Sequence, residues 1–143
     1  MPKHTETRVL PYDPRQMYEL VADVGRYPEF LPWCVGARVV SKTERQLTAD
    51  LLIGFKVFRE RFRSRVDLDP DDRTIQVNYV EGPMRYLEND WQFLPHEKGC
   101  KVEFSVDFEF RSMLLRRAVQ PLFHEAVRRM VAAFESRANA LYG

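Results

Sequence analysis

The amino-acid sequence predicts an α+β fold in which a curved antiparallel sheet of six or seven strands wraps around a long C-terminal helix. Three features of the hydropathy pattern support this prediction. A capped helix follows a first short strand, apolar and polar residues alternate through the middle of the chain, and apolar residues return to helical spacing near the C-terminus. The strands follow one another with no helix between them, so they must pair as an antiparallel meander. A chain of 143 residues is expected to form one domain, residues 1–143.

Cap and turn residues define the N-terminal elements. A strand is predicted over Glu6–Leu10, and a helix then begins at Pro14 with the side chain of Asp13 as its N-cap. Proline suits the first helical position because it has no N–H that would be left without a partner. A second, shorter helical or turn segment is expected over Val24–Leu31, where Pro32 ends it.

Period-two alternation predicts the strands of the sheet. It is clearest over Lys101–Arg111, where one face of the strand is apolar and the other is polar or charged. The inward residues of this strand, which we expect to face the C-terminal helix, are Val102, Phe104, Val106, Phe108 and Phe110. Further strands are predicted over Phe58–Leu68, Thr74–Tyr79 and Tyr86–Leu94, with turns at Pro70–Arg73, Glu81–Pro83 and His96–Gly99.

The last segment is predicted to be a long amphipathic helix with Ser112 as its N-cap. Pro121 should kink or break this helix near its start, because proline cannot donate to the carbonyl four residues back. The sheet needs a cover for its apolar face, and this helix is the one predicted element large enough. Its apolar face is expected to comprise Val119, Phe123, Ala126, Val127, Met130, Ala133, Phe134, Ala138 and Leu141.

The composition argues against several classes of protein. Lys and Arg number 22 and Asp and Glu 21, so the net charge of +1 gives no global field that would attract nucleic acid or membranes. No apolar run is long enough for a signal peptide or a membrane span. Cys34 and Cys100 are expected to be free, buried thiols. These features predict a cytoplasmic protein, with peripheral contact to the inner membrane as an open alternative.

No catalytic residue and no metal site is predicted. His4, His96 and His124 do not stand at the spacing of a metal site, and neither cysteine belongs to a CxxC motif. The chain has no nucleophile elbow, phosphate-binding glycine loop or dinucleotide motif. The sequence therefore favours a binding protein over an enzyme.

Two polar residues fall on predicted inward faces. Alternation places Glu60 between Phe58 and Phe62, and it places Asn89 on the inward face of the strand that holds Trp91. A buried carboxylate without a partner is costly, so Glu60 must be paired, protonated or hydrated. Two explanations stay open: a protein partner or a bulge that turns Glu60 outward, and a role in orienting the polar head of a ligand.

The outward face of the strand that holds Glu60 carries a row of arginines about 7 Å apart. This arginine ladder consists of Arg59, Arg61, Arg63 and Arg65. The ladder is either a solvated face balanced by Asp50 and Asp67 or a docking surface for acidic lipid headgroups or an RNA backbone.

The stretch Tyr27–Trp33 concentrates three aromatic residues and two prolines. The prolines stiffen the chain, and three aromatic rings cannot all be exposed without cost. Two interpretations are open: the stretch plugs one end of the sheet, or it forms the rigid lip of a cavity.

Four blocks of sequence resemble the coenzyme Q-binding START-domain family, and they are LPYDPRQMYELVADVGRYPEFLPWC, EGPMRYLENDWQF, VEFSVDFEFRSMLL and EAVRRMVAAFESRA. This family belongs to the polyketide cyclase/lipid-transfer superfamily with the helix-grip fold, and the resemblance runs nearly from end to end. It implies a sheet that grips the C-terminal helix, in agreement with the predicted element order. It also implies a polyprenyl quinone that is carried, as a chaperone for respiration or quinone synthesis, and not transformed.

Another branch of the same family is named for a ribosome-association toxin, which is reported to bind the large ribosomal subunit. Trp33 and the step Glu60-Arg61-Phe62 resemble the quinone-binding branch. Leu10-Pro11-Tyr12 and Gln16-Met17-Tyr18 resemble the toxin branch as well. The resemblance thus implies the fold more firmly than the partner.

The residues and the resemblance together predict a non-catalytic binding protein for ubiquinone or a similar lipid, which is a ligand here and not a redox cofactor. A ribosome-binding regulator that uses the arginine ladder is the main alternative, and a cyclase-like enzyme with Glu60 as acid or base is a weaker one. Entry is expected between Tyr27–Trp33 and the start of the last helix, and the quinone carbonyls are expected to reach Glu60 or Asn89. The expected ligand-binding residues are Tyr27, Phe30, Trp33, Glu60, Phe62, Asn89, Trp91, Phe104, Phe108, Met130 and Phe134.

Overall fold

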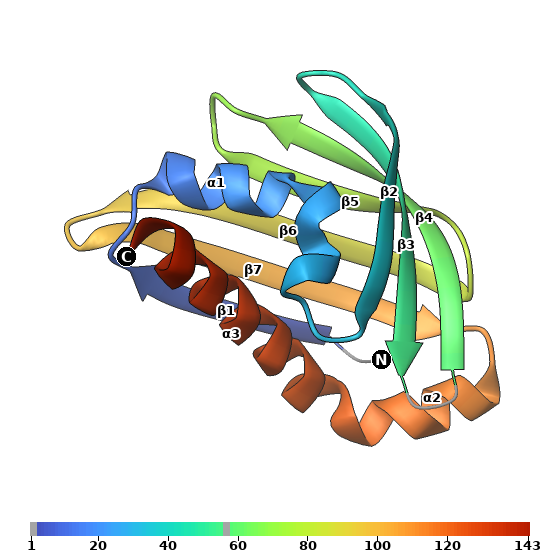
Figure 1. The fold of residues 1–143 in the computed structure, drawn as a ribbon. Helices are drawn as coiled ribbons and strands as arrows, with labels where there is room; N and C mark the ends of the chain where they lie inside the picture. The colour runs from blue at the N-terminus through green and yellow to red at the C-terminus, as the bar shows by residue number, and fades with distance from the viewer. Residues whose placement is uncertain (1–2, 56–57) are drawn as a thin grey trace.

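The computed structural model describes residues 3–55 and 58–143, and its element order is the one predicted: a strand, two helices, six strands and a broken C-terminal helix (Figure 1). The elements are β1 Lys3–Leu10, α1 Pro14–Ala22, the 3-10 helix η1 Val24–Glu29, β2 Cys34–Lys42, β3 Gln46–Phe55, β4 Phe58–Asp69, β5 Thr74–Glu81, β6 Met84–His96, β7 Gly99–Phe110, α2 Met113–Val119, the 3-10 helix η2 Gln120–Leu122 and α3 Phe123–Tyr142.

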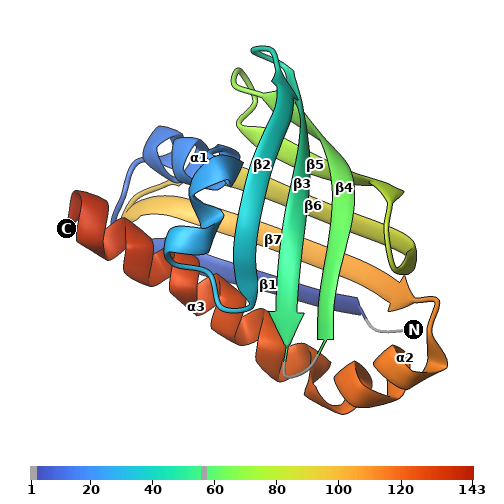
Figure 2. The same cartoon turned by 45° about the vertical axis from the view of Figure 1, so that its right-hand side comes forward.

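Seven strands form one antiparallel sheet in the order β1-β7-β6-β5-β4-β3-β2. The first strand returns to pair with the last, from Lys3 opposite Asp107 to Leu10 opposite Cys100. Register shifts interrupt the ladders in β2, between β4 and β5, and at the start of β6. Such bulges bend and twist strands. The sheet is therefore strongly curved, with β2–β4 rising steeply from the plane of β6 and β7 (Figure 2).

Helices α1 and α3 cover the same concave face of the sheet (Figure 1). Helix α1 begins as predicted: the Asp13 side chain accepts a hydrogen bond from the backbone N–H of Arg15, and the Gln16 side chain accepts one from the backbone N–H of Asp13. The buried residues of α3 are Phe123, Val127, Val131, Phe134 and Ala138. No helix in the described part of the chain is long and apolar enough to cross a membrane.

The C-terminal helix breaks where proline was expected to break it. Residues 120–122 form the 3-10 turn η2 around Pro121, and α2 and α3 lie on either side of it. Leu141 was expected on the apolar face, but this prediction is wrong, because Leu141 is 53% exposed. Its neighbour Tyr142 makes the contacts at this end instead, with its hydroxyl donating to the backbone oxygen of Gln16.

The register predicted for β7 is confirmed. Val102, Phe104 and Val106 are buried, and the half-buried Phe108 packs its ring 5.2 Å from that of Phe123. Phe110 follows on the same face. The side chain of Phe58, which was also expected to point inward, lies outside the described residues.

Phe104→Ala is expected to lower the free energy of unfolding by about 3–5 kcal/mol, because it leaves a cavity in a packed core. Phe104 is 3% exposed, and its ring lies 4.6 Å from that of Trp91. Denaturant unfolding measures the change, and Leu141→Ala is the control, expected within about 0.5 kcal/mol of the parent because the side chain is exposed. A loss below about 1 kcal/mol for Phe104→Ala would break the assigned register.

Candidate functional site

An apolar cavity of about 160 Å³ lies between the sheet and the broken part of the C-terminal helix. Its size is close to that of an engineered apolar cavity of ~150 Å³ that stays dry and binds benzene. The walls come from the sheet on one side and from α2, η2 and α3 on the other. The lining residues are Trp33, Ile53, Glu60, Phe62, Pro83, Met84, Phe108, Phe110, Leu115, Val119, Leu122 and Ala126.

The cavity lies where the C-terminal helix is broken and buries few residues. Leu115 is the one buried residue of α2, and η2 contributes none. Val119 also lines a second hollow of about 170 Å³, between β7 and this segment. A segment with so few buried apolar contacts is among the least stable parts of a fold. The helix break is therefore the wall of the cavity that can open most easily.

Glu60 supplies the single carboxylate of the cavity wall. The pairing of β3 with β4 is continuous and places Glu60 opposite Ile53, so no bulge turns the side chain outward. Within the described part of the chain, the Glu60 side chain makes no hydrogen bond or ion pair. The described residues therefore provide neither the bulge nor the protein partner of the first explanation, and the role in orienting a ligand stays a prediction. A carboxyl group there can accept a hydrogen bond, or donate one when protonated.

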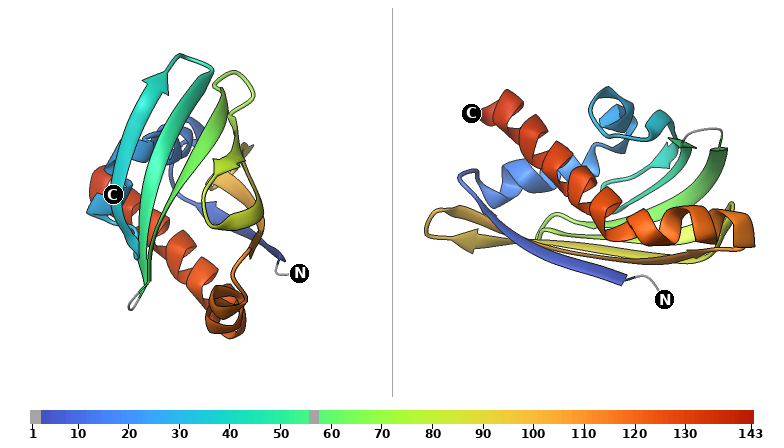
Figure 3. Two further views of the ribbon diagram at one scale, coloured as in Figure 1. Left: turned by 90° about the vertical axis from the view of Figure 1, so that its right-hand side faces the viewer. Right: turned by 90° about the horizontal axis from the view of Figure 1, so that it is seen from below.

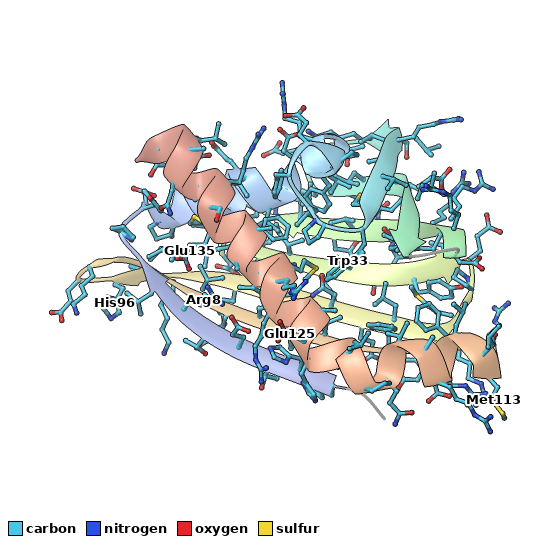
Figure 4. The ribbon with its side chains drawn as sticks, turned by 60° about the horizontal axis from the view of Figure 1, so that its bottom comes forward. Arg8, Trp33, His96, Met113, Glu125 and Glu135 are labelled. Atoms are coloured by element: carbon cyan, nitrogen blue, oxygen red, sulfur yellow. The ribbon has the colours of Figure 1, made fainter. Side chains whose placement is uncertain are left out.

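Trp33 occupies a strained position at the edge of the cavity. Its φ angle is 65°, in the left-handed region that bulky residues rarely adopt. Such a conformation costs on the order of 1–3 kcal/mol and is found most often at functional sites. The indole lines the cavity together with Leu122 and Ala126, and Figure 4 shows Trp33 beside α3.

Four of the predicted ligand-binding residues line the cavity, and they are Trp33, Glu60, Phe62 and Phe108. Most of the others form a packed aromatic cluster, in which the ring of Phe134 lies 5.4 Å from Tyr27, 5.3 Å from Phe30 and 5.1 Å from Trp91. Tyr27, Phe30, Trp91, Phe104 and Phe134 thus pack together in this part of the interior, for which the sequence left open whether it is hollow or packed. The expected position of the cavity is corrected accordingly: it lies nearer the helix break. Met130 also packs against the core and does not line the cavity.

The side-chain amide of Asn89 is hydrogen-bonded within the protein. Its Nδ2 donates to the backbone oxygen of Ser105 at 2.8 Å, and its Oδ1 accepts a hydrogen bond from the indole N–H of Trp91 at 3.0 Å. Asn89 faces the interior as predicted, but it does not line the cavity. Its amide therefore positions Trp91, in contrast to the expectation that it meets a ligand.

The stretch Tyr27–Trp33 was predicted either to plug one end of the sheet or to form the lip of a cavity, and different residues of the stretch do each. Tyr27 and Phe30 plug the sheet by packing on α3, and the Tyr27 hydroxyl donates to the backbone oxygen of Val21. Burial raises the pKa of the Tyr27 hydroxyl. Trp33 alone reaches the cavity.

The prediction missed most of the aliphatic wall. Val119, Ala126 and Phe110 were assigned to the interior but not to a site, and Leu115 and Leu122 were not singled out. The available signal was Pro121, because a helix break predicts the place where the apolar face separates from the sheet. Ile53, Pro83 and Met84 carried no distinctive signal in the sequence.

The arginine ladder faces outward and is largely paired with acids. Arg63 binds Asp50 through two hydrogen bonds of 2.7 and 3.1 Å, Arg61 lies 3.7 Å from the same carboxylate, and Arg65 lies 3.6 Å from Asp67. The hydrogen bond from Arg63 lowers the pKa of the buried Asp50 carboxyl. Three of the four arginines therefore lie beside acids, as the interpretation of a balanced face expects.

A network of polar side-chain contacts joins β1 to α3 through residues that are far apart in the sequence. His4 Nδ1 lies 3.0 Å from His124 Nδ1, and Glu6 contacts both His4 and Arg8 at 2.9 and 2.5 Å. Arg8 donates to Glu135 at 2.8 Å, and Figure 4 shows the two side by side. Burial raises the pKa of Glu6, but the hydrogen bonds from His4 and Arg8 outweigh it and lower the pKa overall. No group of three or more potential metal ligands occurs in the described residues.

Both cysteines are free and buried, as predicted. Burial raises the pKa of the Cys34 thiol and raises that of Cys100 to about 11. Both thiols are thus protonated at neutral pH, which makes them poor nucleophiles.

The family model described as polyketide cyclase/dehydrase and lipid transport matches residues 10–135. The ribosome association toxin RatA of Escherichia coli (strain K12) is 38% identical over 143 residues, which cover 99% of this chain and 90% of that protein. Coenzyme Q-binding protein COQ10 homolog B, mitochondrial, of Xenopus laevis is 35% identical over 145 residues, which cover 99% of this chain and 59% of that protein. The solution structure of the 18 kDa protein CC1736 from Caulobacter crescentus has a TM-score of 0.81 and 39% identity, and the match covers 100% and 99% of the two chains. Relatives therefore carry the names of both branches that the sequence resembles.

Asp50→Asn is expected to destabilise the domain at neutral pH and to matter less as the pH falls. The folded-state pKa of Asp50 is lowered, so its contribution to stability is present above about pH 4, the ordinary pKa of aspartate, and is lost as the pH falls through the folded pKa. Melting temperatures of parent and variant should therefore differ by a constant amount above about pH 4 and converge as the pH falls below it. Asp90→Asn is the control, since Asp90 is exposed and makes no ion pair within the described residues. Equal convergence in the control would contradict the assignment.

Proposed function

Because this chain belongs to the polyketide cyclase/dehydrase and lipid transport family, we propose that it binds a lipid with a small polar ring, of the polyprenyl quinone class such as ubiquinone, without transforming it. The observation that carries the proposal is an apolar cavity with a single carboxylate, closed by a broken helix. The relative named as a coenzyme Q-binding protein supports the choice of ligand.

The size of the cavity favours the ring of the ligand over its tail. Pockets that enclose a drug-sized ligand usually measure about 300–1,000 Å³, whereas this cavity measures about 160 Å³. One ring fits, and a long prenyl tail must pass out between Trp33 and η2 or displace α2. The loosely packed helix break supplies that exit.

The chemistry of the wall suits a quinone ring. Trp33, Phe62 and Phe108 offer aromatic surface to a planar group, and aromatic pairs gain about 0.5–1.5 kcal/mol beyond the burial of their area. The quinone carbonyls accept hydrogen bonds, and a protonated Glu60 can donate one. Glu60 therefore takes the orienting role that the sequence divided between Glu60 and Asn89.

The same wall gives little support to catalysis. Among the lining residues that the structure describes, Glu60 is the one ionisable side chain, and no second acid or base of this part of the chain lines the cavity. General acid–base chemistry on a polyketide needs groups that move protons between defined positions, usually more than one. A carrier needs a single group that fixes orientation, which is what the cavity offers.

Ubiquinone with a single isoprene unit is expected to quench the fluorescence of Trp33 with saturation at one ligand per chain. Ala126→Phe places a ring in the cavity and should abolish the quenching, whereas Ala132→Phe, on the exposed face of the same helix, should leave it unchanged. The two variants are matched in chemistry and differ in the side of α3 that they alter. Phe134→Asp is unsuitable as a test, since Phe134 is 3% exposed in the aromatic cluster and its loss would unfold the domain. Linear quenching, or quenching that survives Ala126→Phe, would sink the proposal.

A second candidate function is binding to the large ribosomal subunit, and the relatives named as ribosome association toxins favour it. The arginine ladder is the surface that we propose for this contact. Asp50 holds Arg63 firmly, but Arg59 and Arg61 are exposed, and Arg61 lies 3.7 Å from an acid that Arg63 already neutralises. RNA phosphates could thus recruit these two side chains with little disruption of the sheet.

Replacing Arg59, Arg61 and Arg65 by Gln is expected to weaken cosedimentation with isolated large ribosomal subunits and to reduce its salt dependence. Each phosphate contact that is lost lowers the slope of log K against log salt by about 0.7–0.9. Arg63 is left in place because its removal would leave Asp50 buried and unpaired. The matched control replaces Arg128 and Arg129, exposed arginines of α3. Absence of cosedimentation even at low salt would eliminate this candidate.

A further inference from the structure

The outer surface of α2 is apolar although no part of the described chain covers it. Met113 is 58% exposed and Leu114 is 66% exposed, the largest values among the exposed large hydrophobic residues. Helix α2, which carries both, lies at the end of the molecule opposite the C-terminus of α3 (Figure 3, right), and Figure 4 shows Met113 at the periphery. Neighbouring exposed apolar side chains of this kind mark interaction sites.

This apolar surface lies on the segment that also forms one wall of the cavity. Leu115 and Val119 form the inner side of α2 and line the cavity, while Met113 and Leu114 lie on its outer side. Leu122 of η2 belongs both to the exposed apolar surface and to the cavity wall, since it is 42% exposed and also lines the cavity. Whatever covers the outer side of α2 therefore contacts the segment that forms this wall of the cavity.

The charges around the apolar surface are positive. Arg111 and Arg117 are exposed and make no ion pair within the residues that the structure describes. Glu109 is the nearby acid, and it is already paired with Arg85 at 3.6 Å and Arg116 at 3.2 Å. Exposed apolar residues flanked by unneutralised arginines match an anionic bilayer, which offers an apolar interior below a negative surface.

We infer that α2 and η2 dock this protein on an anionic phospholipid bilayer, with Met113 and Leu114 inserted among the lipids and Arg111 and Arg117 at the headgroups. The inference rests on the proposed function in one respect: the bilayer is then the source or the acceptor of the cavity's ligand. Docking covers the exposed apolar surface and brings the loosely packed helix break into the lipid phase. The ligand can thus pass between bilayer and cavity without crossing water.

Flotation with lipid vesicles, without added quinone, tests the inference. The protein should float with vesicles of phosphatidylcholine containing about one third phosphatidylglycerol and only weakly with pure phosphatidylcholine. Met113→Asp combined with Leu114→Asp should reduce the partition coefficient at least about ten-fold. Arg111→Gln and Arg117→Gln should each reduce it about five-fold, the effect expected of one basic residue at an anionic surface. Leu141→Asp is the matched control, an exposed leucine at the far end of α3, and should change nothing.

Three results would overturn the inference. Flotation could be absent, or independent of phosphatidylglycerol, or equally reduced by Leu141→Asp. A second copy of this chain is the other occupant to test. If the parent sediments as a dimer that Met113→Asp/Leu114→Asp dissolves, and does not float, the surface is a dimer interface and the inference is wrong.

The quinone titration separates this inference from the proposed function. Met113→Asp/Leu114→Asp alters only the outer side of α2, so this variant should bind ubiquinone with one isoprene unit as the parent does. Flotation without quinone binding would leave membrane docking standing and refute the ligand. Saturable quinone binding without flotation would support the ligand and refute membrane docking.

Discussion

The packing of Phe134 against Tyr27, Phe30 and Trp91 holds the long helix on the sheet, and the other features of the interior depend on where that packing stops. The rings meet at centroid distances between 5.1 and 5.4 Å and leave no room for a ligand. Further along α3 toward its start, Phe123 still reaches Phe108. Beyond Phe123 the backbone breaks at Pro121, and the apolar faces of helix and sheet part to leave the cavity. A solid core thus anchors one end of α3 and leaves the other end available for binding.

The cavity wall contains two features that cost free energy of folding and that a purely structural core would avoid. The Glu60 carboxyl has no partner among the described residues and loses hydration, and the left-handed backbone at Trp33 is strained. Neither feature stabilises the fold, and both face the same small volume. Asn89 is a useful contrast, because its amide is hydrogen-bonded to Ser105 and Trp91 and supports the packed end. Unsatisfied polarity thus distinguishes the binding end from the structural end.

Strand β4 carries the candidate surfaces of both proposed functions. Its inward side presents Glu60 and Phe62 to the cavity, and its outward side presents the arginine ladder. Because successive residues of a strand point to opposite faces, the two surfaces are adjacent in sequence and separated by the sheet. Relatives named for ribosome association and for coenzyme Q binding can therefore share one fold, with each function drawing on a different face of the strand.

Local patterns in the sequence were sufficient to predict the element order, the antiparallel pairing, the cap at Asp13 and the break at Pro121. These follow from local chemistry: side-chain period, capping groups and the missing N–H of proline. It also placed Glu60 on the inward face, because alternation is a local rule. Which inward residues pack and which leave space depends instead on the path of α3 across a curved sheet. The pairing of His4 with His124, the use of Asn89 by Trp91 and the exposure of Leu141 were likewise set by contacts between segments distant in sequence, which no local pattern encodes.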